Sequence, residues 1–346
     1  MIWLVWRQHR QQALFALLGL AALAAFLVPT GVQMHHAFDR AGLGDCLRVA
    51  AKVEFVQVHG RPSQPSDPVT ACRDLAQQFG SRYGSRGIIG VLLWFLPLLV
   101  GLFWGAPLLA REIEQGTHRL VWTQGVSRLR WALAKLGLVG GGALLVAACY
   151  ALLVTWWRAP LDQAATTRIG QRFGFLLFDL VGLAPIGYAL FALALGVFAG
   201  VLVHKSQGAM AITLVAFLAT RIVVEFLVRP RFLAPLRRTF PVVGNMAPNE
   251  ITGDWVLKAG IYSAQGRRLS GGVFGSYSQN VCGAPASDPS IARCAAEYGG
   301  PGAYNLELFH PADRFWLFQG IEAALFVALA VILLLAAVHW VRRRAS

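Results

Sequence analysis

Six long stretches of apolar residues alternate with polar segments along the chain. They cover residues 13–32, 87–110, 133–157, 180–203, 209–228 and 315–338. A helix of about 20 apolar residues crosses the roughly 30 Å hydrocarbon core of a bilayer, so each stretch is long enough to span a membrane. The pattern predicts one all-α polytopic membrane domain over residues 1–346, with six transmembrane helices.

The composition supports a membrane protein. Hydrophobic residues make up 56% of the chain and charged residues 14%, with a mean hydropathy of +0.54, which exceeds what a soluble core needs. The first stretch is longer than the roughly 7–15-residue core of a secretory signal, so we interpret it as a retained helix. The net charge of +14 is typical of basic loops beside anionic lipids, and no basic domain predicts nucleic-acid binding.

Basic residues near the ends of the stretches predict the orientation. If the spans alternate, one side of the membrane receives a dense set of them: Arg7, Arg10, Arg111, Arg119, Arg128, Arg130, Lys135, Lys205, Arg342, Arg343 and Arg344. Cationic loops resist translocation, so this side is cytoplasmic and both termini lie on it. Residues 33–86 and 229–314 then form extracellular loops of a multi-pass protein of the cell membrane.

Cysteine positions agree with this topology, because disulfides persist in oxidising compartments. Cys46 and Cys72 share the first extracellular loop, and Cys282 and Cys294 share the later one. We expect two bridges that tie these loops, Cys46–Cys72 and Cys282–Cys294. Four unpaired thiols are the alternative, since sequence does not fix connectivity.

The remaining features concern the shape of the helices. Residues 1–12 mix Trp3 and Trp6 with Arg7 and Arg10, which is typical of an amphipathic elbow in the headgroup layer or of an ordinary cytoplasmic flank. Glycines four apart predict close helix packing; the pairs are Gly101 with Gly105, Gly137 with Gly141, and Gly196 with Gly200. Pro97 and Pro185 are expected to kink their spans.

Motifs for catalysis are missing from the sequence. It contains no Gly-x-x-x-x-Gly-Lys-Ser/Thr phosphate loop, no His-Glu-x-x-His zinc helix, no Gly-x-Ser-x-Gly turn and no Cys-x-x-Cys pair. We therefore expect no catalytic residue, bound cofactor, metal site or ATP site of its own in this chain.

Four ionisable residues fall within or beside the apolar stretches, where charge is costly and marks a partner or a polar path. They are Asp179, Arg221, Glu225 and Glu322. Arg221 and Glu225 lie one turn apart and are expected to pair along one helix face. One interpretation is a structural pair that holds the fifth and sixth spans in register, and the other is a gate or polar lining on the outer side.

The polar segment 111–132 between the second and third stretches has the features of a docking surface. Gly116 breaks the helix that carries Glu112 and Glu114. Thr117 is suited to cap a short helix that presents Leu120 and Trp122 as anchors. Gly125 gives a second break, and Ser127 is suited to cap the third span.

This segment resembles the coupling segment of the permease subunit of ABC type-2 transporters. The matching positions are Glu112, Glu114, Gly116, Thr117, Leu120, Thr123, Val126, Ser127, Arg128 and Lys135. Gly125 stands where the family often has Pro, and the opening Trp3-x-x-Trp6-Arg7-Gln8 is similar to actinobacterial members.

The resemblance implies a permease subunit of an ATP-driven exporter. ATP and Mg²⁺ bind a separate ABC ATPase, which docks on the cytoplasmic coupling helix, and substrate passes outward between two permeases, identical or related. Two other hypotheses remain. One is a polytopic membrane enzyme with Asp179, Glu225 and Glu322 as catalytic carboxylates, and the other is a structural or sensory membrane protein without transport.

Overall fold

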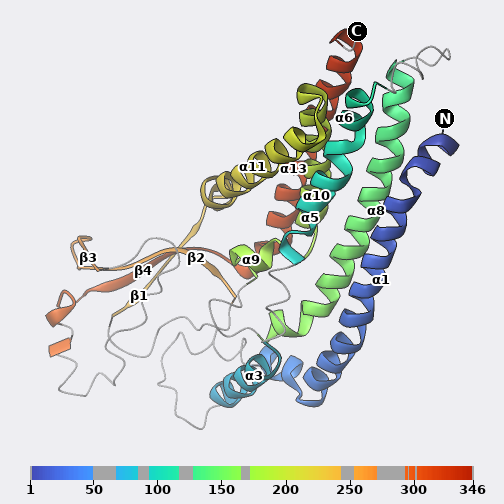
Figure 1. Cartoon of the computed structure of the whole chain (residues 1–346). Helices are drawn as coiled ribbons and strands as arrows, with labels where there is room; N and C mark the ends of the chain where they lie inside the picture. Colours follow the sequence, from blue (N-terminus) through green and yellow to red (C-terminus); the bar gives the residue numbers. More distant parts are fainter. Residues whose placement is uncertain are drawn as a thin grey trace.

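The structure is a computed structural model of the 346-residue chain. It describes residues 2–49, 68–84, 93–116, 128–164, 172–242, 253–270, 293–294, 296–300 and 302–344. Figure 1 shows a bundle of long helices, with a twisted sheet extending from one side. Both chain termini lie at one end of the bundle, and α3 lies at the other.

Helices make up most of the described chain. In chain order they are α1 (Ile2–Arg40), α3 (Pro68–Gly84), α5 (Leu96–Val100), the π-helix η2 (Gly101–Gly105), α6 (Ala106–Glu114), α8 (Arg128–Gln163), α9 (Phe175–Phe178), α10 (Ala184–Val203), α11 (Ser206–Val223), the π-helix η4 (Val224–Val228), the 3-10 helices η5 (Arg229–Arg231) and η7 (Ala312–Arg314), and α13 (Phe315–Arg344).

Within the described residues, five helices are long and apolar enough to cross a membrane. They cover Trp6–Arg40, Leu129–Gln163, Ala184–Val203, Ser206–Arg231 and Ala312–Arg342. The predicted stretch 87–110 appears as α5, η2 and α6 in succession, and residues 85–92 lie outside the described part. A sixth span therefore stays a prediction. The amphipathic elbow also stays a prediction. Residues 2–12 belong to α1, which continues without a break from Ile2 to Arg40 and shows no separate element there.

Helix α10 is the centre of the bundle. It packs against α13, α11, α8 and the α5–η2–α6 segment. Of the residues in its most apolar 18-residue stretch, 72% are buried inside the protein. A helix that is apolar on all sides suits such a central position. Pro185 lies in the first turn of α10, where proline costs no backbone hydrogen bond, so the kink predicted there is wrong. Pro97 lies in the first turn of α5, just after a turn at Phe95 that interrupts the helix, and its kink stays a prediction.

Glycine contacts explain how α10 approaches its neighbour. A Cβ atom on Gly196 would lie 2.5 Å from the Gly101 carbonyl oxygen, and one on Gly105 would lie 2.5 Å from the Leu193 carbonyl oxygen. The predicted packing is therefore confirmed for α10 against η2. The pair Gly137 and Gly141 does not pack this way, because no described atom lies within 4 Å of a Cβ at either position.

The all-α prediction is wrong for the loop before the last span, residues 229–314. Four antiparallel strands form a sheet of order β1-β4-β2-β3 there. They are β1 (Leu236–Pro241), β2 (Trp255–Tyr262), β3 (Arg268–Ser270) and β4 (Tyr304–His310). Residues 304–308 of β4 alternate apolar and polar residues, as is typical of a strand, and its polar residues Asn305, Glu307 and His310 are buried.

The predicted bridge Cys46–Cys72 is confirmed, with its Cα atoms 5.7 Å apart. It joins the chain beyond α1 to α3, so the loop of residues 33–86 is helical at both of its described ends. Cys282 lies outside the described residues, so the second bridge stays a prediction. Cys149 is a free cysteine on α8.

The glycine contacts give a matched test. We expect Gly196→Leu to lower the free energy of unfolding by about 3 kcal/mol, because the side chain would meet the backbone of η2. Gly137→Leu, also in a span, should change it by about 0.5 kcal/mol or less, since space is open there. Unfolding of the purified proteins in detergent measures both. Equal losses would contradict the packing assigned to α10.

Candidate functional site

The described part of the coupling segment begins as predicted. Helix α6 ends at Glu114, and Gly116 has a φ of +69°, the left-handed conformation in which glycine ends helices. Of the other predicted docking residues, those outside the described part are Thr117, Leu120, Trp122, Thr123 and Ser127. Arg128 is the first residue of α8, and its side chain is not described.

The two acidic residues of this segment bind within the protein. Glu112 forms an ion pair with Lys135 of α8, whose side chain is 3% exposed. Glu114 accepts hydrogen bonds from the backbone N–H of Ser206 at 3.1 Å and from its hydroxyl at 3.0 Å. These two bonds lower the pKa of the Glu114 carboxyl and supply a cap to α11, which has none from its own residues.

These contacts fix the segment to three helices. Glu112 joins α6 to α8, and Glu114 joins α6 to the start of α11. Sequence reasoning assigned both carboxylates to docking, but Glu112 and Glu114 each have an intramolecular partner. The two glutamates of the pattern Glu-x-Glu-x-Gly therefore attach the start of the segment to α8 and α11.

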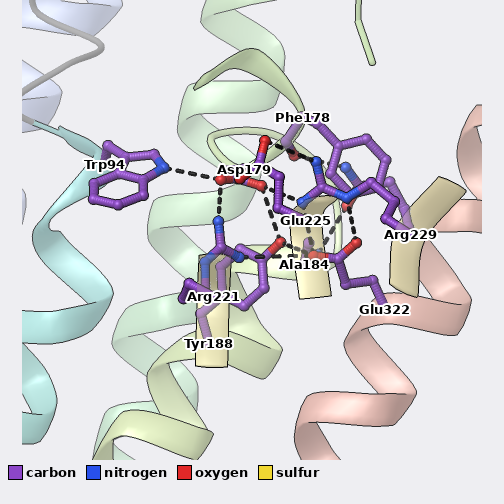
Figure 2. Close-up of polar contacts among 10 residues, drawn as sticks. Trp94, Phe178, Asp179, Ala184, Tyr188, Arg221, Glu225, Arg229 and Glu322 are labelled. Atoms are coloured by element: carbon purple, nitrogen blue, oxygen red, sulfur yellow. Dashed lines mark hydrogen bonds and ion pairs between the residues drawn. The ribbon is translucent and has the colours of Figure 1, made fainter. Parts of the chain in front are cut away.

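The predicted intramembrane residues converge on one buried cluster, shown in Figure 2. Asp179 follows α9 and is 1% exposed. Its carboxylate accepts hydrogen bonds from the Trp94 indole at 2.9 Å and from Arg229 at 2.7 Å, and it lies 3.1 Å from the Tyr188 hydroxyl, whose single proton it shares with Glu322. It also accepts one from Arg221. A carboxylate has about four acceptor sites, so Asp179 is fully used.

Glu322 is the second carboxylate of the cluster and comes from α13. It is 0% exposed. Arg229 donates to it from Nε at 2.6 Å and from Nη2 at 2.8 Å, and the Tyr188 hydroxyl donates at 2.6 Å. Because Arg229 also binds Asp179, one guanidinium group links the turn before α10 to α13 (Figure 2).

The predicted pair between Arg221 and Glu225 is wrong. Arg221 turns to Asp179 and lies 3.7 Å from Glu322, while Glu225 lies 3.5 Å from Arg229. The π-helix η4 between Arg221 and Arg229 changes the helical spacing on which the prediction rested. The structural interpretation is otherwise supported, since the cluster joins α11 to α13.

Sequence reasoning missed Arg229, which it placed in the extracellular loop just beyond the fifth span. The side chain is 1% exposed, and its guanidinium lies 4.1 Å from the centre of the Phe178 ring. Arg221 lies similarly over Tyr188, at 3.5 Å. An arginine directly after a span, with two acidic residues and a tyrosine in neighbouring spans, is the only signal that the sequence offered.

The turn that presents Asp179 is fixed by α13 and α8. Gln319 of α13 accepts a hydrogen bond from the Ala184 backbone N–H at 2.8 Å and donates to the Phe178 carbonyl at 2.7 Å. Gly182, at a φ of +74°, donates to the Thr155 hydroxyl at 2.8 Å. A Cβ at Gly182 would lie 2.9 Å from Gln319, so both the backbone conformation and the close contact require glycine.

The charges of the cluster explain what it can do. Three carboxylates face two guanidinium groups, which leaves one negative charge in excess if all are ionised. The carboxylates that the enzyme hypothesis named do converge. However, Asp179 and Glu322 are closed to solvent and bound to arginine, so neither is placed to accept a proton from a substrate. The geometry favours a structural junction.

The sheet is attached to this junction through His310. Its Nε2–H donates to the Pro230 carbonyl at 3.2 Å, and Arg314 donates to its Nδ1 at 3.3 Å. Nδ1 can accept this bond only in the neutral ring, whose proton then lies on Nε2. Burial lowers the pKa of His310, and the nearby Arg314 lowers it further. Pro230 directly follows Arg229, so β4 is bound to the residue beside the cluster.

We expect Arg229→Met to lower the free energy of unfolding by about 3–5 kcal/mol, because it leaves Asp179 and Glu322 buried without their shared partner. Arg231→Met is the matched control, since Arg231 is exposed two residues later, and should cost about 0.5 kcal/mol or less. Denaturant unfolding in detergent measures both. A small loss for Arg229→Met would contradict the assigned role.

The histidine predicts a pH dependence. The unfolded chain binds a proton at His310 near its ordinary pKa of 6.5, while the folded chain binds it only at lower pH. Stability of the sheet should therefore fall as pH drops below 6.5. His310→Gln should flatten this slope, since an amide keeps a donor and an acceptor without titrating. Hydrogen exchange of the β4 amides across this range measures it, and an unchanged slope in the variant would refute the assignment.

Comparison with known proteins gives one match. A family model described as ABC-2 membrane transporter related matches residues 17–229, which include residues 111–132 and every charged member of the cluster except Glu322. The comparisons with curated proteins and with solved structures gave no match. Because the match covers more than half of the chain, this multi-pass membrane protein belongs to the ABC-2 membrane transporter related family.

Proposed function

We propose that this protein is the permease subunit of an ATP-driven exporter. A separate ABC ATPase binds ATP and Mg²⁺, and substrate passes outward between two permeases, identical or related. The observation that carries this proposal is the family match over residues 17–229. The sequence lacks a phosphate-binding loop, so the energy must come from another subunit.

The orientation in the membrane is inferred from the basic residues at one end of the bundle. The two termini and the end of α6 lie together there (Figure 1), and the sequence places its densest basic residues at this end. Basic loops remain in the cytoplasm. We therefore assign both termini and residues 111–132 to the cytoplasmic side, where an ATPase is accessible, and the sheet to the outside.

The anchored base of the coupling segment supports a mechanical role. ATP can drive a change only if the ATPase binds two permease conformations with different free energies. A displacement of residues 117–127 acts on α6 and α8 directly, because they precede and follow the segment. It also acts on α11 through the hydrogen bonds from Ser206 to Glu114.

Helix α11 continues this path to the other side of the bundle. From Ser206 to Arg229 it passes through η4 without a break in helical structure, a length of about 35 Å at 1.5 Å per residue. At its far end, Arg229 holds α13 and the turn before α10. Movement of the coupling segment would therefore reach the outer side through a continuous helix that is bound at both ends.

The test removes the predicted anchors Leu120 and Trp122. With the ATPase that co-purifies with the wild-type chain, Leu120→Ala with Trp122→Ala should lower the yield of the complex about 10-fold or more, because hot-spot anchors contribute about 2 kcal/mol or more each. Permease-dependent ATP hydrolysis should be lost while membrane insertion is retained.

The matched control is Trp316→Ala with Leu317→Ala, which removes the same two residue types from exposed positions at the opposite end of the bundle. This control should keep both the complex and the hydrolysis. Absence of any co-purifying ATPase would refute the proposed function. Full hydrolysis by the Leu120 and Trp122 variant would refute the docking assignment alone.

A further inference from the structure

A cavity of about 770 Å³ lies between α1, the α5–η2 segment, α8 and α10. Its lining extends along α1 from Gln12 to Leu23 and along the second helical segment from Leu93 to Trp104. Among the described residues that line it, Gln12 has the only amide or charged side chain. The volume falls within the roughly 300–1,000 Å³ of ligand pockets, and the lining suits a hydrocarbon ligand.

The cavity exists because α1 packs on α8 and stands away from α5 (Figure 1). Of the residues in the most apolar 18-residue stretch of α1, only 6% are buried inside the protein. Gly19 faces this space, since no atom lies within 4 Å of a Cβ at that position. The cavity therefore borders the bilayer, and lipid is the apolar material beside it.

The length of the cavity matches one leaflet. From Gln12 to Leu23, at 1.5 Å per residue, α1 rises about 16 Å. Half of the hydrocarbon core is about 15 Å thick. At the far end, the Tyr150 hydroxyl donates to the Leu93 carbonyl at 3.2 Å, so the polar groups there already have partners. The far end is suited to the terminus of an acyl chain.

The near end is polar. Gln12 Oε1 lies 2.7 Å from His9 Nδ1, and among the described residues His9 Nε2 is buried without a hydrogen-bond partner. Gln12 Nε2 donates to the Phe103 carbonyl at 3.5 Å. Arg7 and Arg10 are exposed on the other face of α1, because residues two and five positions before Gln12 do not share its face. An amide and an imidazole beside an apolar slot suit the polar ester region of a lipid whose chains are hydrocarbon.

We propose that this cavity binds one acyl chain of a glycerophospholipid from the leaflet that contains the N-terminus. The ester region lies at Gln12 and His9, and the chain fills the space between Gln12 and Leu23. The lipid thereby packs between α1 and α5, where the two helices make few contacts of their own. This site goes beyond the proposed function, because it holds whether or not the chain binds an ATPase.

The test places the full-length protein in nanodiscs of phosphatidylcholine that contain phosphatidylglycerol with a photoreactive group at the end of one acyl chain. After illumination, mass spectrometry locates the label. We expect labelling to concentrate on Leu20, Leu23 and Leu93, at the far end of the cavity. Labelling spread evenly over the exposed faces of α1, α8 and α11 would show ordinary surrounding lipid and would overturn the proposal.

Two variants test the site independently of the pattern of labelled residues in the wild-type protein. Gly19→Leu should fill the cavity and lose most of the concentrated label. Gly141→Leu is the matched control, because Gly141 is also an exposed glycine with open space around it in a span and does not line the cavity. Equal labelling of the two variants would contradict the site. Should Gly19→Leu fail to fold, the wild-type map decides.

A second copy of the chain is the alternative occupant. Crosslinks between two copies at α1, with no lipid label, would show that a second permease covers the cavity and would overturn the proposal.

Discussion

The guanidinium group of Arg229 makes the contacts on which the end of the bundle nearest the sheet depends. It binds Asp179 and Glu322 at once, with side chains of 1% and 0% exposure. Through these two bonds the end of α11 is held to α13 and to the turn that starts α10. Charges so deeply buried are stable only when each is paired and hydrogen-bonded, so the three elements have little freedom to move separately.

The same helix connects this junction to the opposite end of the bundle. Ser206 at the start of α11 is bound by Glu114, and Glu112 binds Lys135 nearby. Acidic side chains thus hold the bundle together at both ends, while glycine contacts between α10 and η2 hold its middle. The cavity beside α1 lies outside this frame, which explains why lipid rather than protein is proposed to fill it.

The sequence predicted the features that depend on local pattern. Apolar stretches located the five long helices, Gly116 marked the end of α6, and shared loop position paired Cys46 with Cys72. It also identified four members of the cluster. The family resemblance rested on residues 105–128, and the family match includes them.

Features that depend on contacts between distant residues were not predicted. Arg221 and Glu225 are correctly spaced for a pair, but a π-helix and a nearby aspartate redirect both. Residues 304–308 alternate apolar and polar residues as a strand does, but so short a stretch inside a long loop does not show that β1 and β2 pair with it. Arg229 looked like an ordinary loop arginine, and only the fold shows its two carboxylate partners.

A double-mutant cycle between Arg229 and Glu322 tests the central claim most directly. Unfolding of Arg229→Met, Glu322→Met and the double variant would be compared with the wild type. If Arg229 neutralises Glu322 in the core, the double variant should be more stable than Arg229→Met alone, because the second substitution removes a charge left without its partner. Two losses that simply add would contradict the account.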